Sequence, residues 1–252
     1  MAIKKDSPKK ESRGREVWKS LTFSGRLRYL WDYYKLHFVI AAVLLYMAGF
    51  TIHGHFTKKE PLLYGAMVNV ALSRQLEEQL VDRYLDECSI NPAKNPFMLY
   101  RNLYLTDDPS SEVFEYVHAS QMKILGTINA AEMDFAVLDR EAFDAFAQNG
   151  FLYDLDKLLD ENAADHPDLK KKLSDHLVTN MEIKEDNAKE IALNPSVEYH
   201  SVTAEYKMGI DLSSCPVFRD SGFTDPVYLG VISNTPRPGA VLDYLEYLYR
   251  DV

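Results

Sequence analysis

One uninterrupted apolar run, residues 36–52 (LHFVIAAVLLYMAGFTI), contains no Asp, Glu, Lys or Arg. At about 1.5 Å per helical residue, the run reaches roughly 25 Å as a helix, the lower end of the length that crosses a bilayer. Ring and lysine side chains mark its flanks, as interfacial residues do around a spanning helix: Trp31, Tyr33, Tyr34, Tyr46, Lys58 and Lys59. A buried core helix would need protein on all sides, and the preceding segment is too basic to provide it. The run predicts a transmembrane helix over residues 36–56.

Charge is divided unevenly around this run. Residues 1–35 carry ten Lys or Arg and four acidic side chains, a net charge of +6, and the rest of the chain carries −16. Because positive residues close to a spanning helix stay on the cytoplasmic side, the N-terminus is expected inside and residues 57–252 outside. The segment HGHFTKKEP that follows the run has no A-x-A cleavage pattern and no cysteine for lipid attachment. These features predict an uncleaved, single-pass anchor in the cell membrane.

The basic segment before the run, residues 16–34, combines apolar side chains with positive charge. Leu27, Leu30, Trp31 and Tyr34 recur at helical spacing among basic residues, and Ser24-Gly25 is a plausible break. This pattern is typical of an amphipathic helix that lies on anionic lipid headgroups and leads into the bilayer. Nucleic-acid binding is the alternative interpretation of the charge, but beside a membrane span the lipid surface is the better partner. The first 13 residues are polar and expected to be disordered.

Residues 60–252 have the length of one domain and alternate between strand and helix patterns. The expected units are 62–72 with 73–88, 97–106 with 107–130, and 133–139 with 140–150, where Gly150 ends the helix. Strands are predicted near 64–71, 101–106, 134–138 and 227–232, with a helix at 238–249. This alternation favours a three-layer α/β domain with a mostly parallel sheet. The core is expected to include Val68, Val70, Phe135, Val137, Val231, Leu245 and Leu248.

Two segments carry a resemblance to a known family. After the strand MDFAVLD and its helix, Gly150, Leu152, Asp154 and Leu155 follow the pattern G-x-L-x-D-L, and residues 227–249 have a return strand and helix. Together these resemble bacterial extracellular solute-binding proteins of the type 2 periplasmic class, over residues 62–162 and 205–250. The resemblance implies one lobe of such a protein. Only about 60 residues lie between Asn162 and Val227, too few for a second lobe, so a truncated relative is expected. That stretch could form a helix over 168–178, a charged hairpin or loop, and a strand near residues 199–212.

Polar side chains follow the three predicted parallel strands. Ligands in open α/β sheets bind beyond the carboxyl ends of the strands. The candidate ligand-binding residues are therefore Asn69, Ser73, Asp107, Asp108 and Asp139, which could contact sugar hydroxyls, a cationic group or a metal. The simpler interpretation is that Ser73 and the three aspartates cap helices, as Asp108-Pro109 suggests.

The remaining chemistry-bearing residues give little sign of catalysis. Cys88 and Cys215 are the two cysteines, and the sequence allows either one disulfide in an oxidising compartment or two buried free thiols. His53 and His55 lie at the outer end of the apolar run, where a solvated turn is the simpler interpretation. The histidines show no metal-ligand spacing, and the sequence has no P-loop, G-x-S-x-G or G-x-G-x-x-G motif. We therefore expect no cofactor, no bound metal and no enzymatic activity.

The sequence favours a membrane-anchored accessory or interaction module of bacterial origin. Its domain outside the cytoplasm would act beside a transporter or another envelope protein. The alternative is a genuine solute-binding protein that holds a small carbohydrate or peptide for an ABC transporter. A deep polar pocket at the strand ends would favour solute binding, and an exposed apolar surface would favour a protein partner.

Overall fold

The computed structural model describes residues 22–57, 61–106, 114–219 and 221–250. The chain divides into two compact units, Met1–Lys58 and Lys59–Val252, which are described separately. In the first unit, helix α2 (Phe23–Thr57) contains the segment Tyr34–Thr51, which is exposed along its whole length and is long and apolar enough to cross a membrane. The predicted helix over the apolar run is confirmed. The predicted helical segment 16–34 lies partly outside the described residues.

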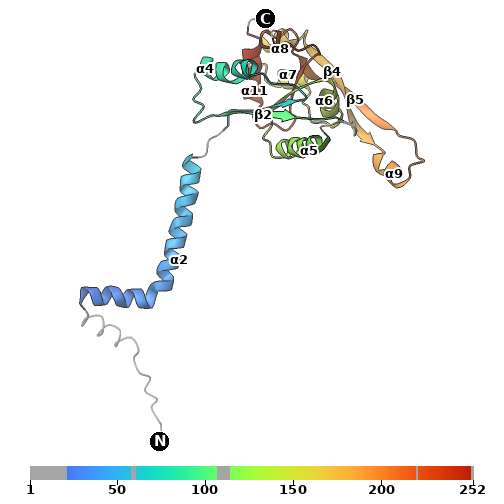
Figure 1. Ribbon diagram of the computed structural model, residues 1–252. Helices are drawn as coiled ribbons and strands as arrows, with labels where there is room; N and C mark the ends of the chain where they lie inside the picture. The colour runs from blue at the N-terminus through green and yellow to red at the C-terminus, as the bar shows by residue number, and fades with distance from the viewer. Residues whose placement is uncertain (1–21, 58–60, 107–113, 220, 251–252) are drawn as a thin grey trace. The chain divides into compact units, whose positions relative to one another are not determined.

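The second unit is built on one six-stranded sheet with the order β2-β1-β3-β6-β5-β4 (Figure 1). Strand β1 (Leu63–Val68) runs parallel to β2 (Phe97–Leu103) on one side and to β3 (Phe135–Leu138) on the other. The remaining strands are antiparallel to their neighbours: β6 (Tyr228–Val231), β5 (Ser201–Asp211) and β4 (Leu177–Asp186). The sheet is therefore mixed, and the prediction of a mostly parallel sheet is wrong. The cause is that the chain after β3 adds a hairpin and a return strand, neither of which uses a parallel crossover.

Helices cover both faces of this sheet. The first strand connection is one helical segment of three parts, α3 (Arg74–Glu77), the π-helix η1 (Glu78–Asp82) and α4 (Arg83–Glu87). The other helices are α5 (Phe114–Asn129), α6 (Arg140–Gln148), α7 (Leu155–Glu161), α8 (Leu169–Leu173), α9 (Ala188–Leu193), α10 (Pro216–Arg219) and α11 (Pro238–Leu248). The domain has the three-layer α/β arrangement that the sequence predicts.

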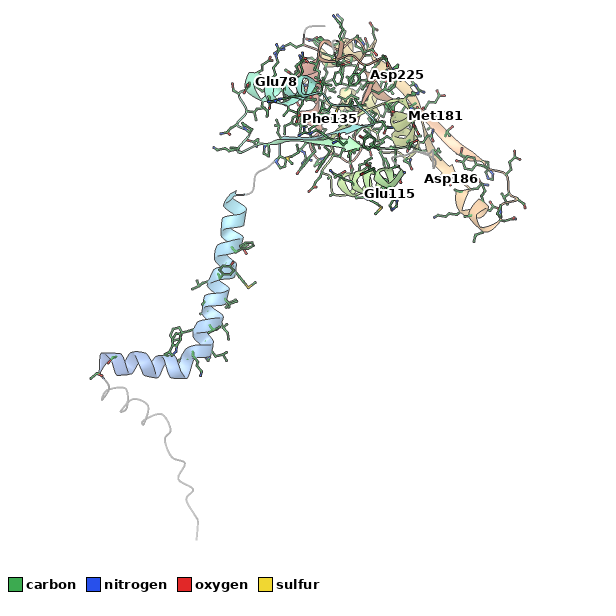
Figure 2. The ribbon with its side chains drawn as sticks, viewed as in Figure 1. Glu78, Glu115, Phe135, Met181, Asp186 and Asp225 are labelled. Atoms are coloured by element: carbon green, nitrogen blue, oxygen red, sulfur yellow. The ribbon has the colours of Figure 1, made fainter. Side chains whose placement is uncertain are left out.

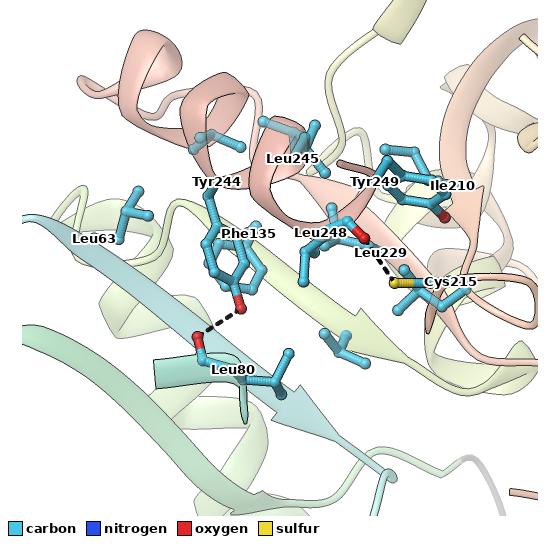
Figure 3. Close-up of a cluster of buried hydrophobic side chains, with 14 of the residues drawn as sticks. Leu63, Leu80, Phe135, Ile210, Cys215, Leu229, Tyr244, Leu245, Leu248 and Tyr249 are labelled. Atoms are coloured by element: carbon cyan, nitrogen blue, oxygen red, sulfur yellow. Dashed lines mark hydrogen bonds between the residues drawn. The ribbon is translucent and has the colours of Figure 1, made fainter. Parts of the chain in front are cut away.

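Each face of the sheet has its own hydrophobic core. One core packs α5 and α6 against residues such as Ala136 and Tyr228. The larger core, on the opposite face, packs α4, α7, α8 and α11 and includes the stacked rings of Phe135 and Tyr244, 5.0 Å apart (Figure 3). The Tyr244 hydroxyl donates a 3.0 Å hydrogen bond to the Leu80 carbonyl. The core residues predicted from the sequence are all buried: Val68, Val70, Phe135, Val137, Val231, Leu245 and Leu248.

Two predicted boundaries are wrong. Strand β2 begins at Phe97 rather than near residue 101 and ends at Leu103, because Asn102 has a φ of 55° and the register with β1 shifts there. The helix expected over 168–178 ends at Leu173, since Leu177 instead pairs with Ile210 in the sheet. Tertiary pairing overrides local helix propensity at that point.

A buried carboxylate connects the return segment to the parallel strands. Asp134 is fully buried, and its Oδ2 accepts hydrogen bonds from the Tyr64 backbone N–H (2.7 Å) and from Nε of Arg237 (2.9 Å). Its Oδ1 accepts one from the Thr235 hydroxyl (2.5 Å). A second guanidinium nitrogen of Arg237 donates to the Ala131 carbonyl at 2.8 Å. These bonds attach the loop before α11 to the start of β3 and to β1.

Replacing Leu245 by Ala should lower the free energy of unfolding by about 2–5 kcal/mol, because the side chain is fully buried in the larger core. Leu193→Ala is the matched control: that leucine is 89% exposed, and its loss should change stability by no more than about 0.5 kcal/mol. Urea unfolding followed by far-ultraviolet circular dichroism measures both. Equal effects at the two positions would contradict the assignment of the core.

Candidate functional site

A cleft lies at the carboxyl ends of β1 and β3. It is lined by residues 69–71 after β1, residues 139–141 after β3, and the loop of residues 222–227 that leads into β6. Its volume is about 540 Å³. This is the place where an open α/β sheet binds ligands, and it contains Asn69 and Asp139, two of the five predicted site residues.

The Asn69 side chain holds the cleft together. Its backbone is left-handed, with a φ of 58°, so the side chain turns back across the strand ends. The Oδ1 atom accepts a hydrogen bond from the Leu105 N–H (2.8 Å), and Nδ2 donates to the Leu105 carbonyl (2.6 Å) and to Oδ1 of Asp139 (3.2 Å). The amide therefore joins the ends of β1, β2 and β3, and these bonds use both hydrogens of its Nδ2.

Helix capping accounts for two further predicted site residues. Oδ1 of Asp139 accepts the Ala142 N–H at 2.8 Å and caps α6, and Oγ of Ser73 accepts the Leu76 N–H at 3.1 Å and caps α3. Ser73 is not among the residues that line the cleft. The capping interpretation is confirmed for both. Asp107 and Asp108 lie outside the described residues.

The cleft also carries a cation that the sequence analysis did not assign to the site. Nε of Arg140 donates to Oδ2 of Asp144 at 3.0 Å, and the guanidinium lies 5.9 Å from the centre of the Tyr228 ring. A hydrogen bond with Tyr228, followed by that with Asp144, raises the pKa of Arg140 above its usual value. Arg140 therefore stays charged beside Asp139 and Asp225. The cleft is therefore of mixed charge. The sequence did not assign Arg140 to it because Arg140 resembled an ordinary first-turn helix residue.

The side chains that line the cleft offer polar and charged contacts. In the part of the chain that the structure describes, no group of three or more His, Cys, Asp or Glu side chains is placed to hold a metal ion. The cleft is open to solvent, and Asn69 and Asp139 use their side chains to order backbone. The arrangement can hold a small polar molecule at its rim between Arg140 and the nearby carboxylates, with little apolar enclosure.

Cys88 and Cys215 are both free thiols. Cys215 is buried, and its Sγ donates to the Leu248 carbonyl at 3.5 Å at the end of α11 (Figure 3). Cys88 is exposed at the end of α4 and lines a second cleft of about 550 Å³ beside α8 and α11. Neither cysteine is bonded in the structure, and Cys88 is exposed, whereas the free-thiol alternative expected both to be buried. The two alternatives stay predictions that alkylation tests.

No family model, curated protein or solved structure matches this chain. The resemblance to a solute-binding lobe stays a prediction.

Loss of the Asp139 cap should cost about 1 kcal/mol of stability in Asp139→Ala. Asn69→Ala should cost more, about 1–3 kcal/mol, because it leaves the Leu105 backbone groups without partners and places Ala at a positive φ. Urea unfolding of both variants measures the difference. If neither change lowers stability, these side chains are not part of the scaffold and ligand binding becomes the better explanation.

Cys88 and Cys215 should differ in their rates of alkylation. Burial raises the pKa of Cys215 to about 11, and burial together with Glu87 and Asp243 raises that of Cys88. The thiolate is the reactive form, so a raised pKa slows reaction at neutral pH, and the rate should climb as the pH rises. Iodoacetamide should label Cys88 in the folded protein more slowly than free cysteine, and Cys215 only after unfolding. A protein that takes up label only after reduction would contain the disulfide.

Proposed function

We propose that this chain is a single-pass membrane protein whose domain outside the cytoplasm is a non-enzymatic accessory or interaction module. It would act beside a transporter or another envelope protein, as a truncated relative of a solute-binding lobe. The length and apolar surface of α2 support the anchor, and the charge of +6 before the apolar run supports an inside N-terminus. Lipid headgroups would contact the basic N-terminal segment.

The hydrogen bonds that Asn69 and Asp139 make within the domain favour an interaction module over a solute receptor. Among the described residues of the domain, every strand belongs to one sheet, so the cleft faces solvent rather than a second lobe. Tight solute binding requires burial of most of the ligand surface and convergent polar groups. In this cleft the side chains of Asn69 and Asp139 bond to backbone and to each other, which is the single observation that carries the proposal.

Solute binding is the second candidate. The cleft volume of about 540 Å³ falls within the range of small-molecule sites, and Arg140 adds a charge that could orient a small carbohydrate or peptide. Such a protein would deliver its ligand to an ABC transporter.

Membrane insertion and solute screening together test the proposal. A reporter enzyme that is active only outside the cytoplasm should be active when fused after Val252. Leu44→Arg should lower insertion, since Arg near the centre of a span costs about 2.5–3.5 kcal/mol, whereas Leu44→Phe should leave it unchanged.

Calorimetry with a panel of sugars and short peptides should give no binding heat.

A reporter active in the cytoplasm would overturn the topology. A micromolar ligand that is lost in Arg140→Ala would overturn the interaction module in favour of solute binding.

A further inference from the structure

The hairpin of β4 and β5, with α9 at its turn, projects from the body of the domain (Figures 1 and 2). Strand β5 pairs with β6 at Ile210 and Asp211, whereas its pairing with β4 continues outward to Ser201. The outer part of the hairpin therefore extends past the edge of the central strands. We call residues 177–211 the arm.

Hydrogen bonds of the Asn187 side chain connect the two sides of the tip of the arm. Asn187 is 9% exposed; its Oδ1 accepts a hydrogen bond from the His200 N–H (2.9 Å), and its Nδ2 donates to the Glu198 carbonyl (2.9 Å). The Asn187 N–H also donates to the His200 carbonyl at 3.3 Å. These bonds connect the two sides of the turn, so the arm presents its surface side chains in a fixed arrangement. Preorganisation of this kind lowers the entropy cost of binding.

Large apolar side chains are exposed along the arm: Met181 (48%), Leu193 (89%), Tyr199 (52%) and Val202 (59%). Single exposed apolar residues are ordinary, and four of them on one projecting element are the apolar surface that a protein partner could cover.

The charge of the arm restricts what can cover it. Residues 181–205 contain six carboxylates and two lysines, a net charge of −4. One of those lysines, Lys184, contacts Glu182 within the arm at 2.7 Å. Anionic lipid would be repelled by this charge, and a second copy would bring the same negative arm and a domain of the same sign. A protein surface with the opposite charge is the occupant that fits.

We propose that the arm docks into a protein partner that presents an apolar pocket flanked by Lys and Arg. The inference rests on the proposed interaction function and names the partner's chemistry. Leu193 and Tyr199 enter the pocket, and Glu185, Asp186 and Glu190 face its basic rim. Opposite charges at the rim of an interface speed the association of the two proteins, and salt screens this attraction. Binding of the arm should therefore weaken as ionic strength rises.

Site-specific photocrosslinking in the full-length chain, in the membranes of cells that produce it, tests this directly. A photoreactive amino acid at position 193 or 202 should give a discrete adduct with a different protein. Mass spectrometry of the adduct should place the crosslink in an apolar segment flanked by Lys or Arg. The same probe at position 98 is the control, because Met98 is 43% exposed on β2 at the opposite edge of the sheet, and should give no such adduct.

Reversing the acidic charges of the arm tests whether the crosslinked protein recognises the arm or only lies near it. The combined change Glu185→Lys, Asp186→Lys and Glu190→Lys should lower the adduct yield about tenfold. The matched change Glu78→Lys, Asp82→Lys and Asp86→Lys, on the exposed side of the first helical segment, should leave the yield within about twofold. In the unmodified chain, adding 0.5 M NaCl before irradiation should lower the yield.

An adduct with lipid, an adduct of two copies of this chain, or a yield indifferent to salt would overturn the inference. Adducts confined to position 98 would also overturn it while leaving an interaction function intact. The absence of any protein adduct, together with a solute that binds the cleft, would overturn both.

Discussion

The buried carboxylate of Asp134 is the constraint on which the arrangement of this domain depends. A charge removed from water must be compensated by donors, and these come from β1 (Tyr64), from the loop after β6 (Thr235) and from the residue before α11 (Arg237). Together the three donors hold the return segment where β6 lies beside β3 and α11 packs over the sheet. Desolvation offsets much of the attraction between Asp134 and Arg237, whereas loss of one partner would leave a buried charge uncompensated.

Local signals in the sequence predicted the elements whose structure is decided locally. Short apolar runs identified β3 and β6 to within a residue, and the helix after β3 ends where Gly150 indicated. There Gly150 has a φ of 69°, and the Phe151 N–H donates to the Phe146 carbonyl, the closing bond of a helix C-terminus. Capping chemistry likewise identified Ser73 and Asp139 as helix caps.

Features that depend on contacts between residues far apart in the sequence could not be predicted from local signals. Apolar patterns do not record strand direction, so the antiparallel half of the sheet was missed. Asp134 and Arg237 are 103 residues apart, and Asp134 looked like the polar boundary of a short strand. Asn69 was predicted as a ligand-binding residue because its position at a strand end is visible in the sequence, whereas its bonds to Leu105 are not. For the arm the sequence suggested a charged hairpin or loop and a strand near residues 199–212, and the hairpin of β4 with β5 is found there, but the place of this hairpin in the sheet was not predicted.

These observations support an anchored domain that binds another protein through its arm rather than a solute through its cleft. Hydrogen exchange with mass spectrometry, on the full chain in its native membranes and after purification in detergent, compares the two surfaces directly. The account predicts slower exchange of residues 181–205 in the membranes, lost on purification, with no change in residues 222–227 beside the cleft. Slower exchange at 222–227 with an arm that exchanges equally in both preparations would contradict it.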